Sequence, residues 1–201
     1  YVLGKLYQDG VYFNKDMDQA MKWFRSAAEL GNEYAAYRMG CLLLLGEEIP
    51  KDVEAAVKWL SLSAEKGNPY AQYRLGMLYL KGEVFSPQVE VAMKWLQQAA
   101  EQKNEWAFYQ LGKLYLSGEH VTKNVETAVH YLGLCAEKGN QYAQYVLGKL
   151  YLCGRDVSCD WEKAVEYLTA SAEQGNLYAS FLLEHLDAYP VSYTHLTLPT
   201  I

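Results

Sequence analysis

The pattern of apolar and polar residues along the chain predicts pairs of helices. Asn68 suits a helix N-cap, Pro69 suits the first helical position, where its missing N–H costs nothing, and Gly82 ends the helix. The apolar residues between them recur at helical spacing and form one stripe: Ala71, Leu75, Leu78 and Tyr79. A helix is therefore predicted over residues 69–81.

A second helix is predicted from about Gln88 to Gln102. Its inward residues are Val91, Ala92, Trp95, Leu96, Ala99 and Ala100. In other segments of the chain, N-cap residues mark the start of such a helix: Asp16, Asp52, Asn124 and Asp160. Glycines suited to a left-handed C-terminal position mark its end: Gly31, Gly67, Gly139 and Gly175. At Lys103 a lysine takes this position, so we expect a strained backbone there.

The helix pair recurs every 36 residues without an insertion. Two series show the period: Gly4, Gly40, Gly76, Gly112 and Gly148, and then Asn32, Asn68, Asn104, Asn140 and Asn176. The first series falls within helices, where glycine survives best if another backbone comes too close for a side chain. Because one helix pair cannot bury both of its faces, each unit must stack on the next. The sequence predicts an all-α fold, a right-handed α-solenoid superhelix of tandem 36-residue helix–turn–helix repeats.

The period divides the chain into five units and a terminal helix, which together cover residues 1–188. The predicted boundaries are 1–36, 37–72, 73–108, 109–144, 145–180 and 181–188. Residues 189–201 form a non-repeat tail. Back-translation of residues 191–200 resembles a transposase mosaic end followed by a sequencing adapter. We therefore interpret the tail as sequencing-adapter read-through and leave it out of the fold.

These residues resemble the Sel-one-like repeat (SLR) family, a tetratricopeptide-like family with 36-residue units. The family pattern is met by residues 71–82 (AQYRLGMLYLKG), by residues 22–28 (KWFRSAA) and by the Gly31–Asn32 pair. The resemblance implies a bacterial adaptor that scaffolds protein complexes. Similar arrays form the C-terminal part of mobilisation relaxases from Firmicutes mobile elements, and residues 139–152 (GNQYAQYVLGKLYL) are particularly similar to those.

Composition and motifs argue against an enzyme, a cofactor protein or a nucleic-acid-binding region. The net charge is −6, whereas a nucleic-acid footprint needs a basic face. The chain has no GxSxG, HExxH or phosphate-binding glycine loop, and its glycines have architectural spacing. We expect no catalytic residues, no cofactor and no metal, since Cys and His have no zinc-ligand spacing. No apolar run reaches membrane-spanning length, so we expect no membrane insertion.

The four cysteines give information about the cellular compartment of the protein. Cys153 and Cys159 flank a turn and could pair if the compartment were oxidising, whereas unpaired cysteines favour the cytoplasm. The chain begins at Tyr1, within a repeat, so a signal peptide could have been lost with the N-terminus. The localisation remains open.

On the first helix of each unit, one face lies outside the stripe of residues predicted to pack in the core. Because this helix lines the concave face in tetratricopeptide-like arrays, we predict that the face binds a protein or peptide with apolar anchors and some acidic groups. The predicted binding residues are Tyr34, Arg38, Tyr70, Arg74, Trp106, Lys113, Tyr142 and Lys149. In the alternative interpretation the tyrosines pack between repeats and the cations are merely solvated.

Two functions remain open. The chain is either a protein–protein interaction adaptor or the docking or regulatory repeat region of a larger enzyme, such as a mobilisation relaxase. In both, this region itself performs no catalysis.

Overall fold

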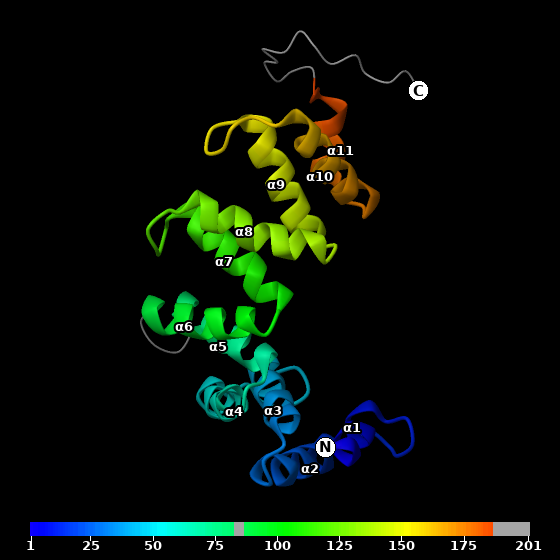
Figure 1. Cartoon of the computed structure of the whole chain (residues 1–201). Helices are drawn as coiled ribbons and strands as arrows, with labels where there is room; N and C mark the ends of the chain where they lie inside the picture. The colour runs from blue at the N-terminus through cyan, green and yellow to red at the C-terminus, as the bar shows by residue number, and fades with distance from the viewer. Residues whose placement is uncertain (83–86, 187–201) are drawn as a thin grey trace. The chain divides into compact units, whose positions relative to one another are not determined.

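The computed structural model describes residues 1–82 and 87–186, and within these ranges the elements are eleven α-helices with no β-strand (Figure 1). The predicted tail, residues 189–201, lies outside the described residues. The helices are α1 (Val2–Asp9), α2 (Met17–Glu29), α3 (Glu33–Leu45), α4 (Val53–Glu65), α5 (Pro69–Lys81), α6 (Val89–Glu101), α7 (Glu105–Ser117), α8 (Val125–Glu137), α9 (Gln141–Cys153), α10 (Trp161–Glu173) and α11 (Leu177–Glu184).

The chain forms two compact units, Tyr1–Leu111 and Gly112–Ile201. Helices α1 to α6 belong to the first unit and α8 to α11 to the second, with the unit boundary falling within α7. Inside each unit, every helix packs on the one before it and the one after it. This succession of helix pairs confirms the predicted all-α repeat fold.

Side chains at the helix N-termini act as the sequence predicts. The Asn32 side-chain oxygen Oδ1 accepts a hydrogen bond from the Ala35 N–H at 2.8 Å, and the Asn68 Oδ1 accepts from the N–H groups of Tyr70 and Ala71 at 3.0 Å. The second helices begin at four predicted caps, Asp16, Asp52, Asn124 and Asp160, each of which accepts from the N–H three residues ahead. Such a cap contributes about 1 kcal/mol to stability.

The left-handed positions after the second helices are also confirmed. Gly31 and Gly67 have φ values of 93° and 96°, and Lys103, at the equivalent position, has a φ of 60°. Glycine has no Cβ penalty in this region, but lysine does. The third repeat therefore carries a strained residue that the other copies avoid.

The structure corrects the reason that we gave for the glycines within the first helices. A Cβ on Gly76 would lie 2.7 Å from the Leu96 Cγ and 3.1 Å from the Ala92 carbonyl oxygen. The closest neighbour is thus a leucine side chain on the second helix, and the backbone comes second. These contacts leave no room for a methyl group, so the glycine allows the two helices to approach.

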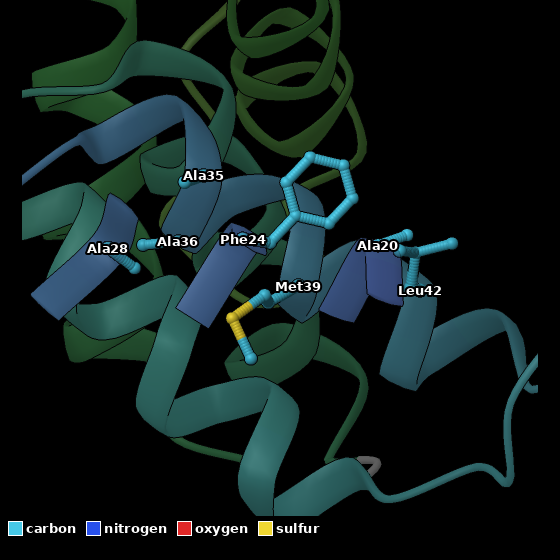
Figure 2. Close-up of a cluster of buried hydrophobic side chains, with 7 residues drawn as sticks. All are labelled: Ala20, Phe24, Ala28, Ala35, Ala36, Met39 and Leu42. Atoms are coloured by element: carbon cyan, nitrogen blue, oxygen red, sulfur yellow. The ribbon is translucent and has the colours of Figure 1, made fainter. Parts of the chain in front are cut away.

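Small and large apolar residues fill the space between consecutive repeats. In the first unit, α2 contributes Phe24 between two alanines, and α3 packs Met39 against it; both large side chains have no exposed surface. Figure 2 shows this cluster, which consists of Ala20, Phe24, Ala28, Ala35, Ala36, Met39 and Leu42. The alanines let the helices come close, and the large side chains fill the remaining volume.

Buried polar side chains join the two helices of a pair, which the sequence analysis did not predict. The Ser63 hydroxyl donates to the Glu33 carbonyl oxygen at 2.7 Å, and the Gln102 side-chain amide donates to the Gln72 Oε1 at 2.8 Å. The second unit repeats both bonds, with the same lengths, between Ser171 and Gln141 and between Gln174 and Gln144. Each bond joins residues 30 apart and fixes the second helix of a pair against the first.

Candidate functional site

The predicted binding residues lie on the first helices of the pairs, α3, α5, α7 and α9. We call this set of residues the first-helix face, and it consists of Tyr34, Arg38, Tyr70, Arg74 and Trp106 in the first unit and Lys113, Tyr142 and Lys149 in the second. The aromatic side chains are between 45% (Trp106) and 53% (Tyr142) exposed. A ring that is half exposed is neither core nor free in solvent, so it can pack on its neighbour and still contact a partner.

In the first unit the structure brings Tyr34, Arg38 and Tyr70 together around one hollow of about 350 Å³. Its other lining residues, Tyr1, Lys5 and Tyr37, were not in the predicted set. We call it the tyrosine hollow. Its lining carries two cations and no carboxylate, so it suits a ligand with negative charge.

Pairs of aromatic rings form the tyrosine hollow. The ring centroids of Tyr1 and Tyr34 are 6.3 Å apart, and those of Tyr37 and Tyr70 are 6.1 Å apart, with interplanar angles of 45° and 42°. The sequence contained a signal for this arrangement. Tyr1 and Tyr37 begin a second tyrosine series with the same 36-residue period, three residues after the position of Tyr34 and Tyr70 in the repeat.

Arg38 is held in place within the tyrosine hollow. Its guanidinium donates from Nη2 to the Gln8 side-chain oxygen at 2.8 Å. Its Nε is buried and has no hydrogen-bond partner among the described residues. Part of the donor capacity of this side chain is therefore unused in the protein.

Arg74 lies in a neighbouring groove of the same unit, which we call the Arg74 groove. It has a volume of about 210 Å³ and is lined by Cys41, Leu44 and Leu45 of α3 and by Arg74, Met77, Leu78 and Lys81 of α5. Tyr37 joins the two sites, because it lines the tyrosine hollow and its hydroxyl acts on the pKa of Arg74, which it helps to raise. The Arg74 groove thus has an apolar floor and two cations, again without a carboxylate.

The thiol of Cys41 is protonated at neutral pH. Burial raises the pKa of this thiol, and this effect outweighs the opposing effects of the hydrogen bond with Tyr37 and of the nearby Arg74. Burial also raises the pKa of the Tyr37 hydroxyl. Cys41 therefore contributes a soft apolar surface to the groove and not a nucleophile.

In the second unit, Lys149 lines a groove of about 340 Å³, which we call the Lys149 groove. Its lining is Leu116, Tyr145, Val146, Lys149, Leu150, Cys153, Arg155 and Asp156. Asp156 is already paired with Lys123 at 2.6 Å, so the remaining charges of the groove are positive. Tyr142 lies on the same helix as Lys149, and Lys113 lies on α7.

The described residues contain no group of three or more His, Cys, Asp or Glu side chains that could hold a metal ion. Within the same part of the chain, no helix combines the length and the apolar character needed to cross a membrane. No disulfide joins the cysteines of the described part of the chain, so the pairing of Cys153 with Cys159 that an oxidising compartment would allow is not formed.

Comparison with protein families and solved structures gives consistent matches. The model of the family described as Sel1 repeat matches residues 1–32, 33–68, 69–104, 107–140 and 141–176. A Sel1 repeat protein from Oxalobacter formigenes is 31% identical with a TM-score of 0.82, and the match covers 95% of this chain and 80% of that one. The unit boundaries that we predicted remain a prediction, because a regular period can be divided at any position.

Two further solved structures are similar. The protein c5321, a protective antigen of uropathogenic Escherichia coli with an SLR fold, is 30% identical with a TM-score of 0.68, and the match covers 92% of this chain and 47% of that one. Helicobacter pylori cysteine rich protein B is 21% identical with a TM-score of 0.53, over 69% of this chain and 99% of that one, and supports the fold alone. No curated protein matches the chain significantly.

Proposed function

The chain belongs to the Sel1 repeat family, whose members generally are protein-interaction scaffolds, and from this premise we propose that it binds a protein partner on its first-helix face. One observation carries the proposal. Half-exposed aromatic rings lie beside arginines and lysines on a chain whose net charge is −6. Central aromatic and arginine residues supply most of the energy in protein interfaces.

The chemistry of the face limits the partner. Tyrosine and tryptophan offer large, rigid apolar surfaces, and the cations next to them attract carboxylates. We therefore infer a protein or an extended peptide with apolar anchors and acidic groups, bound on the concave side of the repeat array. Nucleic acid is a poor alternative because the chain as a whole is acidic.

Trp106 is the strongest candidate for an anchor. Its equivalents in other repeats, Tyr34, Tyr70 and Tyr142, are tyrosines, and the indole ring offers more apolar area and a better cation-binding face. The test combines Trp106→Ala with Lys113→Glu, seven residues apart on α7. After the partner has been identified by affinity capture, its dissociation constant is measured against wild type by titration. We expect the double variant to weaken binding by at least about tenfold, as the loss of an aromatic anchor and a charge predicts.

A matched control uses the same two substitutions on a second helix. Trp23 is 42% exposed on α2, next to the exposed Lys22, so Trp23→Ala with Lys22→Glu removes a comparable ring and reverses one charge outside the first-helix face. Circular dichroism melts check that both variants fold. Equal loss of binding in the two variants, or no loss in the Trp106 variant, would refute the proposed face.

A second candidate is a docking or regulatory region within a larger enzyme such as a mobilisation relaxase. The similarity of residues 139–152 to the repeat region of such enzymes is the observation that favours it. Recovery of the full open reading frame distinguishes this candidate from a separate adaptor. A relaxase domain upstream of residue 1 supports it, and a reading frame that encodes only repeats rejects it.

A further inference from the structure

The Arg74 groove and the Lys149 groove occupy equivalent places in the repeat. Arg74 corresponds to Val146, Met77 to Lys149, and Leu78 to Leu150, each pair being 72 residues, or two periods, apart. Each groove lies within its own unit, between residues of two successive first helices. The same position of the repeat thus forms a groove in each of the two units.

The sequence differs at these positions, yet both grooves have the same chemical character. Arg74 and Lys81 supply two cations in one, and Lys149 and Arg155 supply two in the other, from different positions of the repeat. Leucines form an apolar floor in both, from Leu44 and Leu78 in the first and from Leu116 and Leu150 in the second. A basic rim over an aliphatic floor therefore occurs in both units although no single cation is shared.

The volume of each groove limits the size of the group that can bind in it. Pockets for drug-sized ligands and cofactors measure roughly 300–1,000 Å³ and bury most of the ligand. The Arg74 groove, at about 210 Å³, is smaller, and the Lys149 groove, at about 340 Å³, lies at the lower end of that range. Hollows of this size suit a single side chain of a bound protein.

We propose that each groove is a subsite for an aliphatic side chain of the partner that has an aspartate or glutamate next to it in the sequence. This inference rests on the proposed protein-binding function and specifies the ligand. The aliphatic group covers the leucine floor, and in the Arg74 groove Met77 and Cys41 adapt to its shape because sulfur-containing side chains are polarisable. The carboxylate pairs with the rim cations, where a charge-assisted hydrogen bond is stronger than a neutral one.

Charge complementarity supports this occupant over a basic or purely apolar peptide. The described residues that line the Arg74 groove include no acidic residue, and in the Lys149 groove the one carboxylate, Asp156, is paired with Lys123. The chain as a whole has six more acidic than basic charges. Two local concentrations of positive charge on such a protein favour an acidic segment and repel a basic one.

The test is a selection of random twelve-residue peptides, displayed on phage, against the full chain. We expect the enriched peptides to carry Asp or Glu within two positions of Leu, Ile, Val or Met. Synthetic copies are then titrated by fluorescence anisotropy against Arg74→Glu combined with Lys149→Glu. We expect binding at least about tenfold weaker, because each reversal replaces an attraction by a repulsion.

Lys22→Glu combined with Lys58→Glu is the matched control, since both lysines are exposed on second helices and the total charge changes equally. Unchanged binding to this control and loss with the groove variant support the subsites. Equal loss in both variants would show only a general charge effect and overturn the proposal. A selection on the Arg74→Glu and Lys149→Glu variant should enrich Lys or Arg beside the aliphatic residue, and an unaltered preference for acids would also overturn it.

The outcome separates this inference from the proposed function. Peptides that lack the acidic–aliphatic pair, but lose binding with Trp106→Ala, would reject the subsites and leave the first-helix face in place. Absence of any enriched peptide rejects the subsites, while the titration of the captured partner against the Trp106 variant decides the proposed function separately.

Discussion

Gly112 on α7 lies directly against Leu132 on α8, so that a Cβ on the glycine would come 2.6 Å from the Cγ of the leucine. Leu132 has no exposed surface, and its backbone nitrogen is 3.3 Å from the same point. The leucine cannot move away without displacing its own helix. The equivalent glycine meets a leucine in three other repeats and Phe24 in the first, so this position gives the most direct test of the packing.

We predict that Gly112→Leu destabilises the protein by about 1–3 kcal/mol, the usual cost of overpacking a tight core. Gly133 on α8 is the matched control, because a Cβ there meets nothing within 4 Å. Gly133→Leu should be neutral or stabilise by up to about 1 kcal/mol, since leucine is a better helix former than glycine. Urea unfolding followed by circular dichroism compares the two. Equal free energies of unfolding would show that the glycine series has another cause.

We predict that Lys103→Gly stabilises the protein by about 1 kcal/mol. The φ of 60° at Lys103 is unfavourable for a lysine and free of strain for a glycine. Lys66, which precedes Gly67 and has a φ of −81°, is the control. There the same substitution removes no strain and should be neutral or destabilising. Melting temperatures of the two variants test the prediction, and a lower value for Lys103→Gly would contradict it.

Stability should fall as the pH rises above the ordinary thiol pKa of 9.0. The pKa values of Cys41 and Tyr37 are raised in the folded protein, mainly by burial, so the unfolded chain loses these protons first. The folded state then binds more protons than the unfolded state, and the free energy of unfolding decreases with pH. Thermal melts from pH 7.5 to 10.5 measure the slope. Cys41→Ala should make the slope shallower, and an identical slope in this variant would exclude Cys41 as a cause.

The thiols should divide into two kinetic classes. Cys153 and Cys159 are exposed, whereas Cys135 is buried and Cys41 is largely covered. With an aromatic disulfide reagent we expect two thiols to react quickly in the folded protein and the other two only after denaturation. Mass spectrometry of the labelled peptides identifies each class. Rapid labelling of Cys135 would show that α8 opens without global unfolding.

The sequence predicted the elements well because its signals are local. Asn68 and Gly82 mark the ends of α5 through bonds to their own helix, Pro69 suits the first position because it has no N–H to satisfy, and the left-handed backbone at Lys103 follows from its place in the period. The half exposure of the aromatic rings on the first-helix face agrees with the expectation that the core does not require them. Their role in binding stays a prediction.

The contacts between repeats could not be predicted in the same way. The side chain of buried Gln72 donates to the Ala64 carbonyl oxygen of the preceding helix pair and accepts from Gln102 at the end of its own pair, and nothing in its own helix indicates this. Likewise, the Tyr37 contribution to the tyrosine hollow depends on how closely α3 approaches α5. Such facts require the distance between two helices, which the hydrophobic period does not contain.

The hydrogen bonds between successive helices have a consequence for how such a chain changes in length. The Ser171 hydroxyl reaches the Gln141 carbonyl oxygen, and Ser63 reaches Glu33, each across 30 residues. A fold maintained by links of this range has a low contact order, and folding can start in any repeat and spread to the next. Duplication or loss of one 36-residue segment of the gene leaves every remaining repeat with an equivalent neighbour. The number of grooves offered to a partner can therefore change in single genetic steps while the core is preserved.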